Sequence, residues 1–301
     1  MRPSTGSKVL WSELLPHEFR NRMKYNPTVY LPLGLCEPHG QVSAFGLDTI
    51  KAEWLCEQAA LRVGGIVAPS MGYHIHETGY HARWLEEEIG DNNPHMTGIP
   101  PAVMLQLFLY QLRAFVNAGF RTIIVISGHS GGNQVDIRRA ADLFMRHIPV
   151  HVWVRSDPEL VEGLYEGDHA GKYELSQQMY LRPDLVDMRA RSYENEPDSG
   201  GRLALGLDAD EASPELGKLI MEACLDRLCV EADRMKRMYA NEEIPPINYG
   251  LIQIIWSELL RTADEWVTAQ PWPSQEEVSP QSRWKPYERY SPNGTGAEYR
   301  F

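Results

Sequence analysis

Apolar positions along residues 28–154 follow two alternating patterns, which predict strands and helices in turn. Short, nearly continuous apolar runs such as TVYLPLG and FRTIIVISGH are typical of parallel strands that are covered on both faces. Longer segments have helical periodicity, and PPAVMLQLFLYQLRAFVNAG begins with proline and ends with glycine, as helices commonly do. Strands are expected over 28–34, 66–68, 150–154 and within 120–129, and helices over 48–63, 100–119 and 135–147. This alternation indicates βαβ units and a parallel sheet.

The remainder of the chain adds helices and then changes in composition. Further helices are expected over 11–24, with an interruption at Pro16, over 172–182, and over the long amphipathic segment 211–240. After Pro245 the composition shifts, and residues 271–301 contain five prolines. We therefore expect one domain over 1–244 and a C-terminal extension over 245–301. The extension is predicted to pack on this domain or on a neighbouring subunit.

Charge and cysteine content narrow the classes of function. The formal net charge of −12 argues against nucleic-acid binding, which usually requires a basic face. No apolar run is long enough to span a membrane, and the first 20 residues lack the apolar stretch of a signal peptide. The four cysteines have no zinc-finger spacing. A cytoplasmic protein that acts on small molecules, without membrane or nucleic-acid partners, is the simplest interpretation.

Acidic residues and histidines gather where the predicted strands end. The first strand is followed by Glu37 and His39, and the third by His129 in SGHSGGN. A histidine-rich run, GYHIHETGYH, follows the second strand, and GDHAGKYELS lies farther along the chain. Six of the ten histidines fall in these four segments. Because the carboxyl ends of parallel strands meet at one edge of a sheet, these side chains are expected to form one site.

The chemistry of these residues favours a transition metal, although each motif taken alone also fits a simpler role. Histidine combined with carboxylates suits Zn²⁺, Mn²⁺ or Fe²⁺ better than Ca²⁺. Taken singly, the Glu37–His39 pair has a structural or surface role more often than a metal-binding one, and His129 could be an ordinary core histidine. GHSGGN could also bind phosphate at a helix N-terminus, but it lacks the lysine of a P-loop.

Taken together, the motifs resemble the creatininase (creatinine amidohydrolase) family. The resemblance rests on LPLGLCEPHG, with Asp48 nine residues after His39, on SGH after a strand, and on HAGKYELS followed by LRPDLVDM. It spans about residues 29–188. The family implies a three-layer α/β/α fold with a mostly parallel central sheet, and hydrolysis of C–N bonds in small cyclic substrates with two divalent metal ions. It also implies a homo-oligomer, a hexamer in many members.

The resemblance assigns roles to individual residues. It implies that Glu37 and His129 serve one metal, that His39 serves the other, and that Asp48 bridges both. Creatinine hydrolases take a further ligand from the second residue after the SGH histidine, which is glycine here. A second branch of the family uses the glutamate of HAGxxE instead, so Glu174 is expected to complete the second metal site. His169 and Glu174 are expected to be catalytic, with His169 relaying a proton to the leaving nitrogen.

Several motifs depart from the family pattern around the substrate. EQHG is EPHG here, GHGGN is the longer GHSGGN, and the tryptophan that creatinine hydrolases place before HAG aligns with Tyr165. The metal chemistry survives these changes, whereas the creatinine pocket is altered. The residues expected to line the substrate pocket are His74, His76, Tyr80, His81, Asn133, Tyr165 and Asp168.

The function expected is that of a binuclear metallohydrolase. In the mechanism that the resemblance implies, a hydroxide shared by two metals attacks the carbonyl of a small cyclic amide. One alternative is the opening of a cyclic ketone or lactone of a sugar-like or inositol-like compound, in which no amine leaves. Another is a non-catalytic scaffold of the same fold. Such a scaffold would be expected to lose metal ligands, whereas all five are present here.

Overall fold

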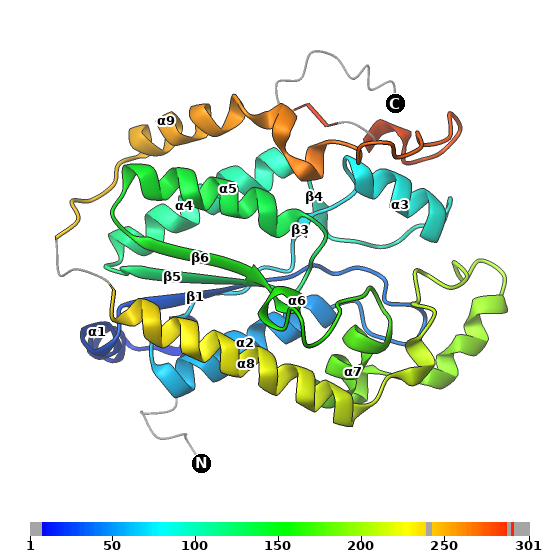
Figure 1. The fold of residues 1–301 in the computed structure, drawn as a ribbon, viewed down its shortest axis with the longest axis horizontal. Helices are drawn as coiled ribbons and strands as arrows, with labels where there is room; N and C mark the ends of the chain where they lie inside the picture. Colours follow the sequence, from blue (N-terminus) through cyan, green and yellow to red (C-terminus); the bar gives the residue numbers. More distant parts are fainter. Residues whose placement is uncertain (1–7, 239–242, 288–289, 292–301) are drawn as a thin grey trace.

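A four-stranded parallel sheet lies at the centre of the molecule (Figure 1), in a computed structural model that describes residues 8–238, 243–287 and 290–291. Its strands are β1 (Thr28–Leu33), β2 (Ile66–Val67), β5 (Thr122–Ser127) and β6 (His151–Ser156), in the order β2-β1-β5-β6. Thr28 of β1 pairs with Thr122 of β5, which in turn pairs with His151 of β6. The carboxyl ends of the three long strands therefore lie at one edge of the sheet.

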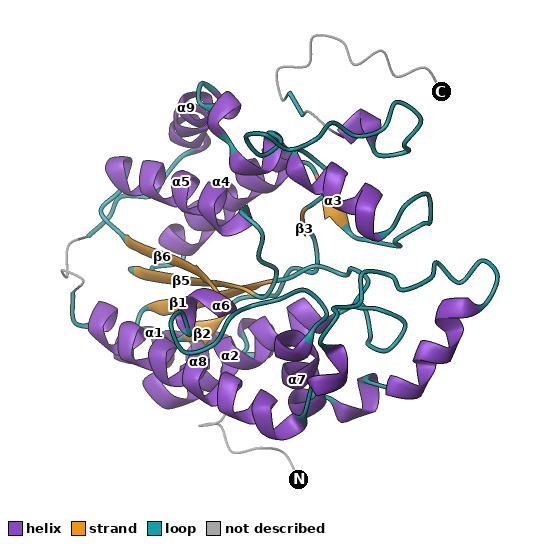
Figure 2. Ribbon diagram, turned by 45° about the vertical axis from the view of Figure 1, so that its right-hand side comes forward, coloured by secondary structure: helices purple, strands orange, loops and turns teal. Residues whose placement is uncertain are grey.

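Alternation along the strands sends apolar side chains into two separate cores. Val29, Leu31 and Leu33 of β1 pack on the side of α4 (Pro101–Asn117) and α5 (Asn133–His147). Tyr30 packs on the opposite side with α2 (Leu47–Val63) and α8 (Pro214–Lys236). Figure 2 shows the sheet between these two helical layers. Because both faces of the sheet are covered, β1 and β5 are buried along their whole length, whereas the edge strand β6 alternates between buried and half-buried positions. The predicted three-layer α/β/α fold is confirmed.

Shorter elements surround this frame. They are the helices α1 (Pro16–Tyr25), α3 (Tyr80–Glu88), α6 (Asp157–Leu160), α7 (Lys172–Leu181) and α9 (Tyr249–Leu260), and the paired strands β3 (His74–Ile75) and β4 (Gly98–Ile99). Turns of 3₁₀ helix occur at Trp11–Glu13, Pro183–Leu185, Met188–Asn195, Ala209–Glu211, Ala263–Glu265, Val267–Ala269 and Lys285–Tyr287. None of the described helices is both long and apolar enough to cross a membrane.

The expected elements are present, with shifted ends. Helix α5 begins at Asn133, two residues before the predicted start, and β6 runs on to Ser156. Helix α8 is shorter than the predicted 211–240. It starts at Pro214 because the Ser213 hydroxyl accepts a hydrogen bond from the Leu216 amide as an N-cap, and residues 239–242 lie outside the described part of the chain. Helices α3, α6 and α9 were not predicted.

The described part of residues 245–301 packs closely on the outer helical layer. Ile252, Ile255 and Leu259 of α9 join the core formed by α4 and α5, and the following Trp266 is wholly buried. Asp136 of α5 accepts hydrogen bonds from the Val267 and Thr268 amides. The division of the chain at residue 244 stays a prediction.

Candidate metal centre

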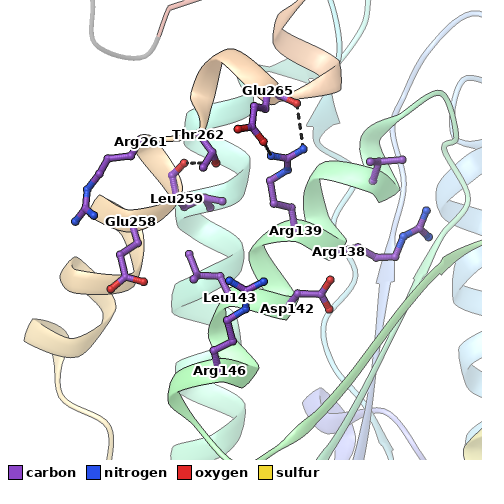
Figure 3. A pocket seen from close by; sticks show the side chains of 11 residues that line it. Arg138, Arg139, Asp142, Leu143, Arg146, Glu258, Leu259, Arg261, Thr262 and Glu265 are labelled. Atoms are coloured by element: carbon purple, nitrogen blue, oxygen red, sulfur yellow. Dashed lines mark hydrogen bonds and ion pairs between the residues drawn. The ribbon is translucent and has the colours of Figure 1, made fainter.

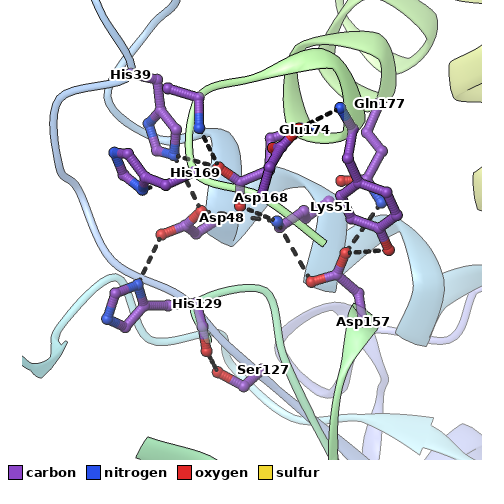
Figure 4. A network of polar contacts seen from close by, with 12 residues as sticks. His39, Asp48, Lys51, Ser127, His129, Asp157, Asp168, His169, Glu174 and Gln177 are labelled. Atoms are coloured by element: carbon purple, nitrogen blue, oxygen red, sulfur yellow. Dashed lines mark hydrogen bonds and ion pairs between the residues drawn. The ribbon is translucent and has the colours of Figure 1, made fainter. Parts of the chain in front are cut away.

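Five buried side chains meet at the carboxyl edge of the sheet, and Figure 4 shows His39, Asp48, His129 and Glu174 among them. Glu37 and His39 follow β1, and His129 follows β5. Asp48 lies in the first turn of α2 and Glu174 in the first turn of α7. These are the five residues expected to bind metal, and the fold brings all of them together although 137 positions separate Glu37 from Glu174 (174 − 37).

The five side chains form two groups that share Asp48. In the first group, Nδ1 of His129 lies 2.7 Å from Glu37 Oε1 and 3.5 Å from Asp48 Oδ2. In the second, Nε2 of His39 lies 3.3 Å from Asp48 Oδ1 and 3.4 Å from Glu174 Oε2. Each oxygen of Asp48 therefore faces a different group. The donor atoms of each group lie within 4.8 Å of one another, close enough to share one ion.

Unsatisfied polar atoms show that these groups fit metal ions. Both carboxylate oxygens of Asp48 and Nε2 of His39 are buried without a hydrogen-bond partner in the described structure. Buried polar atoms are normally hydrogen-bonded, so these atoms require another partner. Nδ1 of His39 lies 3.1 Å from the Glu37 carbonyl oxygen, and donation of its N–H there directs the Nε2 lone pair into the site. The donor set of imidazoles and carboxylates suits a borderline transition metal.

A buried lysine supports the second group. Nζ of Lys51 donates to Glu174 Oε1 at 2.6 Å and lies 3.3 Å from Asp157 Oδ1. Burial alone would raise the pKa of Glu174, but the Lys51 ammonium and His39 outweigh it and hold that pKa below its ordinary value. Glu174 is therefore ionised and able to bind a cation. Lys51 and Asp157 were not predicted from the sequence; the available signal was the position of Lys51, one helical turn after Asp48.

His169 and Asp168 lie beside the second group with different tasks. Nε2 of His169 lies 3.0 Å from the Pro38 carbonyl oxygen, and its ring stacks on His39 with 4.9 Å between centroids. The His169 Nδ1 atom is 4.0 Å from Glu174 Oε2. Asp168 accepts hydrogen bonds from the backbone amides of the first turn of α7. Asp168 therefore shapes the turn that presents Glu174.

A small pocket opens next to the first group. Its volume is about 220 Å³. It is lined by Glu37, His76, Tyr80, His81, Trp84, His129, Ser130, Gly131, Asp168 and His169. Four residues of the predicted substrate pocket are among them: His76, Tyr80, His81 and Asp168. Trp84 was not predicted to line it, because α3 was not recognised as a helix. On that helix the positions of His81 and Trp84, three residues apart, share one face.

The other three predicted pocket residues do not line this pocket. His74 is fully buried behind His129, with its Nε2 atom 3.2 Å from the Ser127 hydroxyl oxygen. Tyr165 packs with the apolar cluster between the sheet and α8. Asn133 is wholly buried at the start of α5. The sequence places these residues near the motifs, but their backbone directs the side chains into the protein.

The pocket presents neutral imidazoles to a ligand. Burial lowers the pKa of both His76 and His81, so both rings are uncharged at neutral pH. Nδ1 of His76 accepts a hydrogen bond from the Glu77 amide, which places the ring proton on Nε2, 3.3 Å from Glu37 Oε2. His76 therefore faces the first group as a hydrogen-bond donor. Among the described residues, no lysine or arginine lines the pocket.

A larger hollow lies away from these residues (Figure 3). It has a volume of about 720 Å³ and lies between α5 and α9. Arginines line much of it, and Arg139 forms an ion pair with Glu265 across it. Within the described residues, every group able to hold a metal ion lies at the sheet edge instead. The smaller pocket is therefore the candidate active site.

Comparison with known proteins gives the same family as the motifs. The creatininase model, described as creatinine amidohydrolase, matches residues 12–231. The creatinine amidohydrolase of Pseudomonas putida is 27% identical over 274 residues, which cover 80% of this chain and 99% of the relative. The 3-dehydro-scyllo-inosose hydrolase of Thermotoga maritima is 28% identical over 199 residues, which cover 62% of this chain and 60% of that protein.

Solved structures share the fold. A crystal structure of creatinine amidohydrolase (creatininase) has a TM-score of 0.62 at 24% identity, with coverage of 78% of this chain and 99% of the other. A manganese creatininase has a TM-score of 0.62 at 23% identity, covering 75% and 98%. A mutant creatininase of the Zn-Zn type has a TM-score of 0.61 at 24% identity, also covering 75% and 98%.

Proposed function

The chain belongs to the creatininase family, and we propose that it is a hydrolase that uses two divalent metal ions to cleave a small cyclic amide. One observation carries the proposal: two groups of buried acids and imidazoles share Asp48, whose two oxygens have no hydrogen-bond partner among the described residues. A carboxylate that offers one oxygen to each side is what a pair of adjacent ions requires. A scaffold protein would have no use for such an arrangement, because ionisable groups are costly to bury.

The two positions draw on different residues of the chain. Glu37, Asp48 and His129 would hold one ion, and His39, Asp48 and Glu174 the other. Zn²⁺, Mn²⁺ and Fe²⁺ all suit these donors. The solved zinc and manganese creatininases, which share the fold, support the first two.

The metal ions and the pocket residues would contribute different parts of the chemistry. Bound ions of this kind lower the pKa of water and polarise a carbonyl oxygen. His169 is the proposed proton donor to the leaving nitrogen, because it lines the pocket and its Nδ1 atom lies on the side of Glu174. The rings of Trp84 and His169 meet edge to face, with 5.0 Å between their centroids. Trp84 would contact one face of a flat or puckered substrate ring.

A second candidate is the opening of a cyclic ketone or lactone that carries several hydroxyl groups. The observation that favours it is the pocket wall: His76, His81 and Tyr80 offer neutral hydrogen-bonding groups, and the described lining includes no lysine or arginine. Such a wall suits hydroxyl groups as well as it suits an amide ring. The similarity to a 3-dehydro-scyllo-inosose hydrolase supports the same substrate class. In this reaction no amine leaves.

Metal analysis combined with a substrate panel tests the proposal. Wild-type protein is expected to contain about two equivalents of transition metal and to hydrolyse a cyclic amide or a polyhydroxylated cyclic ketone. Asp48→Ala should lose both ions and all activity, because it removes the shared ligand. Asp142→Ala, a change at an exposed position on α5, is the matched control and should keep both ions and the activity. Wild-type protein that takes up no metal would rule the function out, and the preferred substrate distinguishes the two candidates.

A further inference from the structure

Lys51 is a fully charged side chain with almost no contact with solvent. Its exposed fraction is 1%, and it lies on α2 one turn after Asp48. Nζ of Lys51 lies 2.6 Å from Glu174 Oε1, 3.3 Å from Asp157 Oδ1 and 3.9 Å from Asp48 Oδ1. Lysine is rarely buried to this degree unless it is paired, because removing an ammonium from water is costly. A specific role for this lysine is therefore to be expected.

The two oxygens of Glu174 have different partners. Oε1 accepts from Lys51, whereas Oε2 accepts from the Ala170 amide at 2.9 Å and lies 3.4 Å from His39 Nε2. These contacts fix the rotation of the carboxylate, as Figure 4 shows. Only Oε2 is left facing His39 and Asp48. Without Lys51, the carboxylate could turn about its last torsion, which has a broad energy minimum.

Asp157 in turn holds Lys51. Its Oδ2 atom accepts hydrogen bonds from the Tyr173 hydroxyl and the Gln177 amide, both at 3.0 Å, and this leaves Oδ1 for the ammonium. Tyr173 and Gln177 lie on α7, the helix that carries Glu174. Lys51 lies on α2, the helix that carries Asp48. The Lys51–Asp157 pair therefore joins the two helices that supply the carboxylates of the second group.

We propose that Lys51 is a positioning residue that holds Glu174 in the orientation needed to bind the second metal ion through Oε2. The inference rests on the proposed function. It assigns Lys51 to one of the two metal positions only, because Glu37 and His129 have no contact with it in the described structure. Loss of a partner behind a metal ligand typically weakens metal affinity by about 10- to 100-fold. That loss is expected at the second position and not at the first.

The experiment is a titration of metal-free protein with Co²⁺, read by the visible absorption of the bound ion. The main variant is Lys51→Met combined with Asp157→Asn, which removes the ammonium without leaving Asp157 as an unpaired buried charge. Asp157→Asn alone is the matched control and keeps the contact between Lys51 and Glu174. Lys51→Gln is a second test variant, since its side chain is neutral and one bond shorter and therefore removes the ion pair with Glu174. Circular dichroism checks that each variant folds.

Wild type and Asp157→Asn are expected to bind two equivalents, with two distinguishable steps. In the double variant the second step should weaken by about 10- to 100-fold while the first stays unchanged. If the double variant folds and its second step is unchanged, the inference is overturned and the proposed function stands. If the double variant does not fold, an unchanged second step in a folded Lys51→Gln overturns the inference in the same way. Failure of both to fold also overturns it, because Lys51 would then serve the fold. Wild type that binds no Co²⁺ overturns the proposed function itself.

Discussion

At the residue scale, the metal-free site holds acids and imidazoles that share protons. Burial would lower the pKa of His129, but the carboxylates of Glu37 and Asp48 outweigh it and raise that pKa to about 10. The same balance, with Asp48 and Glu174 as partners, raises the pKa of His39 well above its ordinary value. Both rings are therefore protonated at neutral pH when no metal is bound, and a metal ion must displace these protons.

This proton binding predicts how stability depends on pH. A histidine whose pKa is raised by folding stabilises the native state below its unfolded pKa, and that stabilisation is lost as the pH rises through the folded pKa. The free energy of unfolding of metal-free protein should therefore fall between pH 6.5 and about 10, the ordinary and folded pKa values of His129. Urea unfolding at several pH values measures it. Metal-loaded protein is the control and should show a smaller fall; equal slopes would contradict the prediction.

The sequence identifies residues that belong to spaced chemical motifs. It does not identify residues whose role depends on tertiary packing. All five expected ligands meet at one site. They could be predicted because acids and histidines rarely gather at successive strand ends by chance. Lys51 was not identified because a lysine on a helix ordinarily points to solvent. His74 lies two positions before His76 but turns away from the pocket. The direction of a side chain in an irregular loop depends on tertiary contacts, which the motif does not contain.

At the element scale, close approach between helix α2 and the strand ends positions the ligands. A Cβ atom on Gly128 would lie 1.9 Å from the carbonyl oxygen of Asp48, and one on Gly34 would lie 2.4 Å from Thr49. The start of α2 therefore rests directly on the backbone that follows β1 and β5. This contact sets how far Asp48 lies from His129, which comes immediately after Gly128.

Gly128→Ala should separate these two elements. The added methyl group cannot fit against the Asp48 backbone, so we expect a loss of about 1–3 kcal/mol in the free energy of unfolding. Weaker binding at the first metal position should accompany it, since Asp48 and His129 move apart. Gly46→Ala is the control: its Cβ would meet only Ile50 at 3.9 Å, and its backbone is not in the left-handed region. Denaturation measures the free energy of unfolding, and metal titration measures binding at the first position. Equal effects of Gly128→Ala and Gly46→Ala would refute the prediction.

The elements missed by sequence reasoning have weak local signals. Helix α3 contains only nine residues and follows a short strand. Its helical periodicity is therefore hard to recognise next to the histidine-rich segment before it. Helix α9 had a clearer signal, with Asn248 as its N-cap and an apolar stripe. The change in composition after Pro245 concealed it. The long strands and helices of the central layers were predictable because their periodicity extends over many residues.

At the scale of the whole molecule, the described C-terminal segment contributes to the main core. Trp266 is wholly buried among residues that pack with α9 and the outer layer. Trp266→Ala should lower the free energy of unfolding by about 3–5 kcal/mol, because it creates a large cavity. Trp272→Ala, at a half-exposed tryptophan six positions on, is the comparison and should cost much less. A negligible effect of Trp266→Ala in denaturant titrations would show that the core does not depend on this segment.

Assembly and location are not fixed by the fold of one chain. The expected homo-oligomer, a hexamer by family resemblance, and the cytoplasmic location stay predictions. Sequence periodicity identifies surfaces buried within a domain, but it does not say which exposed faces meet a second copy.

The packing of α3 links the pocket wall to the C-terminal segment, which lies outside the span that matches the family. The proposed metal ligands all fall within residues 12–231, the span that matches the family. The pocket wall on α3 is instead held from behind by the C-terminal segment: the amides of Gly79 and Tyr80 donate to the carbonyls of Tyr287 and Gln270, and Trp284 packs under Leu85. Exchange of this tail between relatives would thus retune substrate preference while leaving the hydrolytic machinery untouched.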